Sequence, residues 1–172
     1  MQVATKKETV ETQKRQFCTF WISGRHLGVD VLDVKEINTE VNFTPIFHAP
    51  KEVMGYVNIR GQIYLILDLR LILGFESKEV DELSRVVLFK ADTGDPFGVL
   101  VDSTSDMITV DDDQIENRRV EDQEPREEGV ERRKLGGLAA GVCKLEEGLL
   151  VILEARKLLN VIKQLCSTAS VA

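Results

Sequence analysis

The chain has 172 residues, of which 43% are apolar, and its 22 basic and 29 acidic side chains give a formal net charge of -7. This length suits one substantial core or two small cores that share an interface. The acidic balance argues against a nucleic-acid partner, because binding to the phosphate backbone needs concentrated positive charge. No window approaches the roughly eighteen uncharged apolar residues of a membrane span, and residues 1–16 lack the apolar block of a secretory signal. We therefore expect a cytoplasmic protein with a flexible tail at 1–16 and no direct membrane insertion.

The first structured elements are predicted to form a hairpin. An apolar strand at 17–23 turns at Gly24-Arg25 and returns through the block at 27–31. The same order recurs 70 residues later, with a strand at 86–91 and a second aliphatic block at 97–101. Two copies of this size are long enough for each to close its own small sheet. We predict a mainly β protein with two packed β-barrels, the first at about 17–84 and the second at about 85–154.

Short helices are expected to punctuate the strands. Pro50 and Gly55 flank residues 51–54, an arrangement typical of a helix that starts at a proline and ends before a glycine. We therefore predict a short helix over 50–54.

Residues 55–74, GYVNIRGQIYLILDLRLILG, carry a two-residue apolar rhythm. Because alternate side chains of a strand point to opposite faces, the rhythm predicts one buried face at the odd positions. These positions are Val57, Ile59, Ile63, Leu65, Leu67 and Leu69, and the opposite face holds Asn58, Arg60, Gln62, Tyr64 and Asp68. Since the run is longer than an ordinary strand, Gly61 predicts a bulge, a tight bend or a chain reversal. Arg60 then lies beside a corner and is aimed away from the core.

The sequence pattern at the end of this segment is repeated near the C-terminus. Residues 66–73 and 152–159 align with an acid and an arginine in register, at an offset of 86. The larger offset places extra sequence at 116–134, a mixed-charge run that predicts an exposed loop. Asp68 and Glu154 are expected to hold turns or pair with the neighbouring Arg70 and Arg156, and not to act as an acid-base pair.

The last element is a predicted helix over about 155–166. Leu158, Leu159, Ile162 and Leu165 recur at spacings of three and four, which gives an apolar stripe for docking on a barrel. Residues 167–172 are small, and predict a flexible tail.

Few side chains are candidates for chemistry. His26 and His48 are the only histidines, and neither lies in a nucleophile elbow or a metal-binding helix, so both are expected to be ordinary surface residues. The run at 111–113 lacks the glycine of a calcium loop, since Glu116 stands at the sixth position, and it predicts helix capping instead. We predict no enzymatic activity, no cofactor and no metal.

Cysteine usage is typical of a reducing compartment. Cys18, Cys143 and Cys166 are odd in number and widely separated, with no CxxC pair among them. They are expected to be buried reduced thiols.

Several blocks together resemble the CheW domain of bacterial chemotaxis coupling proteins. They are LGVDVLDVKEI, HAPKEVM, the segment 55–74, FGVLVDSTSDM and GLLVILEARKLL, and the resemblance runs from about residue 17 to about residue 165. It implies two SH3-like five-stranded barrels without enzymatic activity. It also implies an adaptor that joins the cytoplasmic tips of chemoreceptors, the methyl-accepting chemotaxis proteins, to the regulatory domain of the histidine kinase CheA. Further CheW-like domains are expected as partners in membrane-associated receptor arrays, to which the protein would be recruited.

The resemblance also assigns a receptor-binding groove between the barrels. The matching positions are Val34, Gly55, Arg60 and Met107, with Glu36, Ile37 and Asn58 as weaker candidates for partner contact. Spacing alone favours a packing role between the barrels for Val34 and Met107, and it leaves a solvated turn residue open for Arg60. However, nothing in the second copy reproduces the sequence 58–61, so folding explains this corner least.

Other functions stay open at this point. The same features fit a coupling protein of a non-flagellar pathway, such as pilus-driven movement, or a double barrel that binds a small ligand or an oligonucleotide. A hydrolase is the weakest alternative. Only a short tail follows Leu165, so we expect a stand-alone coupler without a receiver domain. The segment 116–134 is longer than the family's usual connection and either tunes affinity or is simply solvated.

Overall fold

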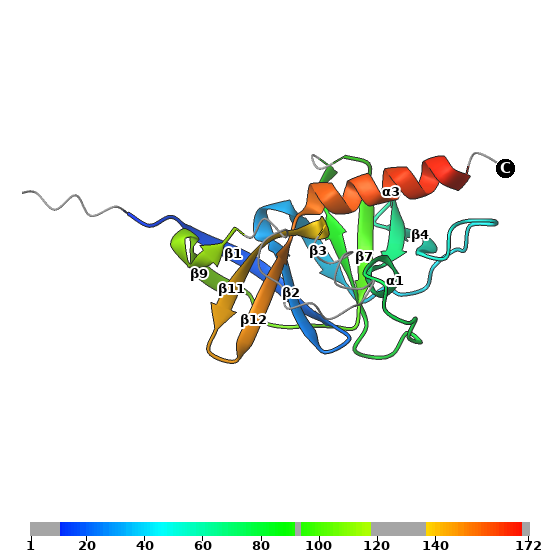
Figure 1. Cartoon of the computed structure of the whole chain (residues 1–172). Coiled ribbons are helices and arrows are strands. Elements are labelled where there is room, and N and C mark those ends of the chain that lie inside the picture. The colour runs from blue at the N-terminus through cyan, green and yellow to red at the C-terminus, as the bar shows by residue number, and fades with distance from the viewer. Residues whose placement is uncertain (1–10, 92–93, 118–136, 170–172) are drawn as a thin grey trace, which may run out of the picture.

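The computed structural model describes residues 11–91, 94–117 and 137–169, which form two sheets and a C-terminal helix (Figure 1). The five-stranded sheet has the order β3-β6-β7-β5-β4. Its strands are β3 (Val34–Asn38), β4 (Val53–Ile59), β5 (Gln62–Asp68), β6 (Arg85–Phe89) and β7 (Phe97–Val101).

The seven-stranded sheet has the order β10-β11-β12-β2-β1-β8, and β9 also pairs with β1. Its strands are β1 (Lys14–Ile22), β2 (Arg25–Asp30), β8 (Ser103–Thr104), β9 (Ile108–Asp111), β10 (Ile115–Glu116), β11 (Ala139–Leu145) and β12 (Gly148–Leu153). The helices are η1 (Val31–Asp33), α1 (Leu69–Ile72), η3 (Asp112–Gln114) and α3 (Ala155–Ala169). The expected mainly β fold with a C-terminal helix is confirmed.

The two halves share one pairing scheme. The hairpins β1–β2 and β6–β7 are both antiparallel. The second strand of each hairpin also has a parallel neighbour, which is β12 for β2 and β5 for β7. The strand that follows each hairpin then crosses over, because β3 pairs with β6 whereas β8 and β9 pair with β1. The predicted boundary between barrels at residues 84 and 85 is therefore wrong for the strands, since each sheet takes strands from both halves. A period-two pattern identifies strands but not their partners.

A shared core joins the sheets. Its buried residues include Phe20 and Leu27 from the seven-stranded sheet, Leu67 and Val99 from the five-stranded sheet, and Leu158 from α3. Burial of each such side chain contributes about 1.5–3 kcal/mol, so the two sheets and the helix stabilise one another. Smaller clusters fill the far side of each sheet.

The hairpin β4–β5 confirms a chain reversal at Gly61 and corrects the predicted buried face. Arg60 and Gly61 are the two turn residues, with φ of 53° and 84°, the positive values of a type I′ turn. A two-residue turn pairs an odd position with an even one, here Val57 with Tyr64. The buried face of the barrel therefore moves to Tyr64, which is 2% exposed, whereas Ile63 is 59% exposed.

The other face of β5 is also buried. This strand lies between β4 and β7, so Leu67 packs into the shared core while Tyr64 and Ile66 pack into the smaller cluster. A central strand covered on both sides has apolar residues at odd and even positions alike, so the odd-position rhythm does not identify a single buried face in β5.

The predicted helix over 50–54 is absent. Residues 51–52 form a turn in which the Val53 N–H donates to the Pro50 carbonyl oxygen at 3.0 Å, and β4 begins at Val53. Pairing of Val53 with Leu67 across β4 and β5 overrides the local helix signal.

The ends of the chain also differ from the prediction. Residues 14–16 belong to β1, because they pair with β9, and α3 continues through Ala169 instead of ending at 166. Residues 1–10 and 170–172 of the predicted tails and nearly all of the predicted charged loop at 116–134 lie outside the described residues.

Candidate partner-binding site

The tip of the β4–β5 hairpin holds Arg60 in a defined position. The Asn58 Oδ1 atom accepts from the Gly61 N–H at 2.9 Å, which closes the turn. A non-glycine residue at positive φ costs about 1 kcal/mol, so the pairing of the two strands must hold Arg60 there. Its side chain is 79% exposed. The expectation that Arg60 points away from the core is confirmed.

Arg60 is ion-paired with Glu36 on β3. The guanidinium Nη1 lies 2.7 Å from Glu36 Oε2, and the second carboxylate oxygen accepts from Asn38 Nδ2 at 2.9 Å. The Glu36 side chain is only 20% exposed, so it is a more fixed partner than a surface carboxylate.

This ion pair also shows how the five-stranded sheet curves. β3 and β4 are the two edge strands of that sheet, yet the hairpin that begins with β4 reaches β3 through Arg60 and Glu36. A second contact joins Lys35 Nζ to the Tyr64 hydroxyl at 2.7 Å. A sheet whose edges meet in this way is rolled up, as a small barrel requires.

The structure brings only some of the predicted residues together. Arg60, Glu36 and Asn58 form the tip, and Ile37 follows Glu36 on β3 with 41% of its surface exposed. Val34, by contrast, is 8% exposed and belongs to the shared core.

Gly55 and Met107 lie elsewhere. Gly55 is buried, and a Cβ at this position would overlap the carbonyl oxygen of Thr44, whose backbone bridges Tyr56 through two hydrogen bonds of 2.8 Å. Met107 is 62% exposed and lies between β8 and β9 of the seven-stranded sheet.

An exposed apolar groove near this hairpin was missed by the sequence reasoning. A cavity of about 340 Å³ is lined by Tyr56, Ile63 and Leu65 of the hairpin, by residues 95–97 and by residues of α3 that include Leu159 and Ile162. The odd-position rhythm predicted that Ile63 is buried. Arg60 and Gly61 were the available signal against this, because after a two-residue turn the buried positions of the next strand change from odd to even.

The two histidines considered as catalytic or metal-binding candidates both pack against aromatic rings. His48 is exposed, at a φ of 60°, with its ring edge-on to Phe47, whereas His26 is half-buried and stacks on Trp21. Within 11–91, 94–117 and 137–169, three or more His, Cys, Asp or Glu side chains nowhere gather as metal ligands. In the same ranges, no helix is long and apolar enough to span a bilayer.

The acidic residues mostly hold turns, as expected. Asp68 caps α1 by accepting from the amides of Arg70 and Leu71 at 2.9 and 3.4 Å. At η3, the Gln114 side chain accepts from the Asp111 N–H at 3.1 Å, which is a capping contact before Ile115. Glu154 stands at the first turn of α3, where its carbonyl oxygen accepts from the Lys157 N–H at 3.1 Å, and its carboxylate pairs with Lys157 at 3.5 Å instead of with Arg156.

The cysteines divide into two groups. Cys18 and Cys143 are buried, and burial raises the pKa of both thiols. Cys166 is exposed, so the expectation of a buried thiol is wrong there; it lies on the same side of α3 as Leu159 and Ile162 and lines the exposed groove with them.

Comparisons with known proteins agree with this fold. The family model for the CheW-like domain matches residues 16–163. The chain is 31% identical over 102 residues to a chemotaxis protein CheW of Rhizobium meliloti, an alignment that covers 59% of this chain and 65% of that protein. It is 26% identical over 141 residues to the chemotaxis protein CheW of Bacillus subtilis, covering 82% and 84%. The match to the rhizobial protein thus spans slightly less than two thirds of its length.

One solved structure matches over a larger share of the chain. The scaffolding protein TtCheW from Thermoanaerobacter tengcongensis superimposes with a TM-score of 0.69 at 22% identity, covering 83% of this chain and 90% of that one. At this identity the similarity concerns the fold.

Proposed function

Because the chain belongs to the CheW-like domain family, we propose that it is a non-catalytic scaffold that couples chemoreceptors to the histidine kinase CheA. In this role it is recruited to receptor arrays at the membrane, and other CheW-like domains are further neighbours there. The protein performs no chemistry. It holds the kinase in an arrangement that the receptor can change. Such control requires only that the receptor bind two arrangements of the complex with different affinity.

The observation that carries the receptor contact is the Arg60–Glu36 pair. A guanidinium has five N–H donors, and the ion pair with Glu36 at 2.7 Å involves Nη1. With 79% of the side chain exposed, donors are left for a carboxylate or a carbonyl of a receptor helix. Because the turn and Glu36 already restrict the side chain, less conformational entropy is lost on binding.

The remaining candidates take different parts in the proposal. Ile37 and Met107 are exposed apolar side chains that suit direct contact with a helical hairpin. Val34 and Gly55 are buried, and they act by fixing β3 and β4.

Reconstitution tests the proposal. Receptor fragments, kinase and this protein are combined, and kinase autophosphorylation is followed with and without the receptor stimulus. Receptor control of the kinase is expected only when this protein is present. Normal control in its absence would contradict the coupling role.

Charge-reversal variants separate contact from structure. Arg60→Glu is expected to weaken receptor binding about tenfold or more, because it places a carboxylate where a guanidinium met the partner. Arg60→Glu combined with Glu36→Arg restores the internal ion pair but leaves the exposed tip negative. If the double variant recovers receptor binding, Arg60 is structural and the contact proposal fails. Lys144→Glu, at an exposed position on β11, controls for the change in net charge.

A binding survey then identifies the pathway. Tip fragments of the organism's own receptors are titrated with the protein, and the receptors that bind decide between flagellar movement and another output. Titration with an oligonucleotide should give no salt-sensitive binding, given the charge of -7.

A further inference from the structure

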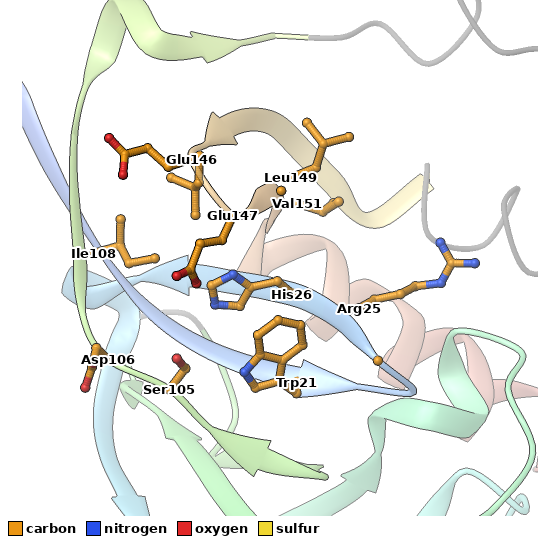
Figure 2. Close-up of a pocket in the computed structure, with 13 residues that line it drawn as sticks. Trp21, Arg25, His26, Ser105, Asp106, Ile108, Glu146, Glu147, Leu149 and Val151 are labelled. Carbon is orange, nitrogen blue, oxygen red and sulfur yellow. The ribbon is translucent and has the colours of Figure 1, made fainter.

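A cavity of about 700 Å³ opens at one end of the seven-stranded sheet (Figure 2). Its walls are the tip of the β1–β2 hairpin, the connection between β8 and β9, and the tip of the β11–β12 hairpin. The parallel pairing of β2 with β12, which sets Leu27 against Val151, places the two hairpin tips at the same end of the sheet. Neither Arg60 nor Glu36 lines this cavity.

Two stacked aromatic rings form one wall. Trp21 and His26 are cross-strand partners whose ring centroids lie 4.4 Å apart with planes 8° from parallel. Trp21 is 39% exposed, which is a large apolar surface to leave in water. The His26 Nε2 atom is buried and has no hydrogen-bond partner among the described residues.

The polar rim of the cavity is mostly acidic. The carboxylates of Asp106, Glu146 and Glu147 line it, against one cation, Arg25. Figure 2 shows Glu147 extending toward the imidazole of His26, whereas Arg25 points away from the two rings. Burial lowers the pKa of His26, against the opposing effect of the Glu147 charge. The imidazole therefore stays neutral near pH 7 and does not offset the acidic rim.

Aliphatic side chains complete the walls. Leu149 is 57% exposed, and Ile108 and Val151 line the cavity beside it. A negative rim next to aromatic and aliphatic surface is complementary to a cation carried on an apolar stem, which describes arginine and lysine side chains.

We propose that this cavity binds an extended segment of a partner protein that presents an arginine or lysine next to an aliphatic residue. The cation packs against Trp21 and donates to the Glu147 carboxylate, and the aliphatic residue covers Leu149. A small cation alone would leave Leu149 in water, so the arrangement favours a peptide segment over a metabolite. The inference is separate from the contact at Arg60 and Glu36, because neither residue lines this cavity, although Met107 of the proposed receptor surface stands in sequence between Asp106 and Ile108.

Trp21 supplies a reporter for the test, because it is the only tryptophan in the chain. The probe is the tetrapeptide acetyl-Leu-Arg-Leu-Arg-amide, titrated into the intact protein at low salt while tryptophan emission is followed. We expect saturable binding with a blue shift, weakened by added salt. Acetyl-Leu-Glu-Leu-Glu-amide should cause no change. Equal binding of both peptides would overturn the proposal, and so would arginine amide binding as tightly as the tetrapeptide.

Matched variants locate the binding. The double change Glu146→Gln and Glu147→Gln should weaken the tetrapeptide about fivefold, as expected for two exposed ion pairs. The same change at Glu79 and Glu82, exposed carboxylates before β6, should have no effect.

The apolar wall is tested in the same way. Leu149→Ser should weaken binding severalfold, whereas Leu83→Ser, at a residue that is 63% exposed, should not. All six positions changed in these variants and controls are exposed, so the variants should keep the wild-type amide spectrum. If the cavity variants bind the tetrapeptide as the wild type does, the assignment of this cavity is wrong.

Discussion

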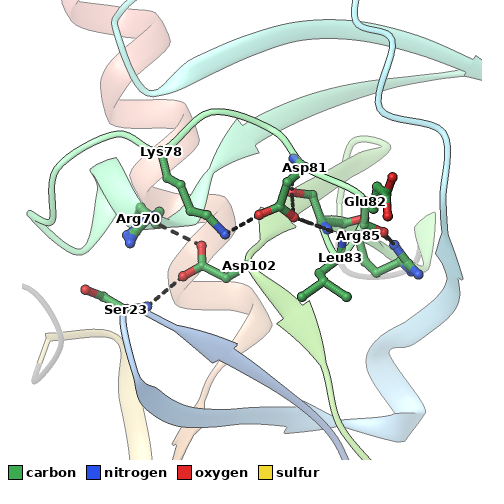
Figure 3. A network of polar contacts seen from close by, with 9 residues as sticks. Ser23, Arg70, Lys78, Asp81, Glu82, Leu83, Arg85 and Asp102 are labelled. Carbon is green, nitrogen blue, oxygen red and sulfur yellow. Dashed lines mark hydrogen bonds and ion pairs between the residues drawn. The ribbon is translucent and has the colours of Figure 1, made fainter.

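Arg70 and Asp102 link the two sheets through a largely buried ion pair. The Arg70 Nε lies 3.3 Å from Asp102 Oδ1, and the two side chains are 16% and 17% exposed. The other Asp102 oxygen accepts from the Ser23 N–H at 2.8 Å, in the turn between β1 and β2 (Figure 3). Asp102 therefore joins α1, which follows β5 of the five-stranded sheet, to the β1–β2 hairpin of the seven-stranded sheet.

Asp102→Ala is expected to destabilise the protein by about 2–3 kcal/mol. The change removes two contacts and leaves Arg70 partly buried without this carboxylate, although Asp68 lies close enough to interact with it. Urea unfolding measures the loss as a lower midpoint. Asp113→Ala, at an exposed aspartate, should change the stability by about 0.5 kcal/mol or less. Equal effects of the two changes would contradict the linking role.

Asp68 should make stability depend on pH in the acid range. Burial raises its pKa above 3.8, with a further contribution from the Asp102 charge, against the amide hydrogen bonds from Leu71 and Arg70 and the Arg70 charge. The folded state then binds the proton more tightly than the unfolded state, so this carboxyl lowers stability as pH rises from 3.8 through the folded pKa.

Asp68→Asn isolates that effect, because asparagine does not titrate and still caps a helix. The stability of the variant relative to the wild type should increase as pH rises through this window and then level off. Urea unfolding at a series of pH values from about 3 to about 7 checks it. A difference that is constant, or that falls with rising pH, would show that the pKa is not raised.

The strands could be predicted from the sequence to a large extent, but their pairing could not. The hairpins β1–β2 and β6–β7 follow from apolar runs separated by turns, and α3 follows from its stripe of leucines. The crossing of β3 to β6 depends on which edges are free after the hairpins form, and local patterns carry no information on that.

The candidate site shows the same division. The exposed corner at Arg60 could be predicted from Gly61 and the two-residue rhythm. Its pairing with Glu36 could not, because that contact spans 24 positions in the sequence and depends on the rolling of the sheet. Similarly, the cavity near Trp21 needs three separate segments to meet.

The three cysteines should react with a thiol reagent at very different rates. Burial raises the pKa of Cys18 and Cys143 and limits access to them, whereas Cys166 is exposed on α3. Ellman's reagent should therefore label one thiol quickly in the native protein and all three in urea. Cys166→Ser should abolish the fast phase. A fast phase that survives in this variant would mean that one of the buried thiols is reached in the native state.

Gly55→Ala should cost about 3 kcal/mol or more. Its φ is 134°, and a Cβ would overlap the Thr44 carbonyl oxygen, so the variant combines backbone strain with the loss of the bridge between Thr44 and Tyr56. Gly148→Ala is the matched control, because its φ is 143° but the space around it is open. The control should cost about 1–2 kcal/mol from strain alone.

Comparing Gly55→Ala with Arg60→Glu shows how Gly55 affects the proposed receptor binding. If it acts by seating residues 44–45 against β4, Gly55→Ala should lower receptor affinity together with the protection of the Tyr56 amide from hydrogen exchange. Arg60→Glu should lower the affinity and leave that protection unchanged, because Arg60 is exposed at the turn. A Gly55→Ala protein with wild-type stability and weakened receptor binding would instead place Gly55 in direct contact with the receptor.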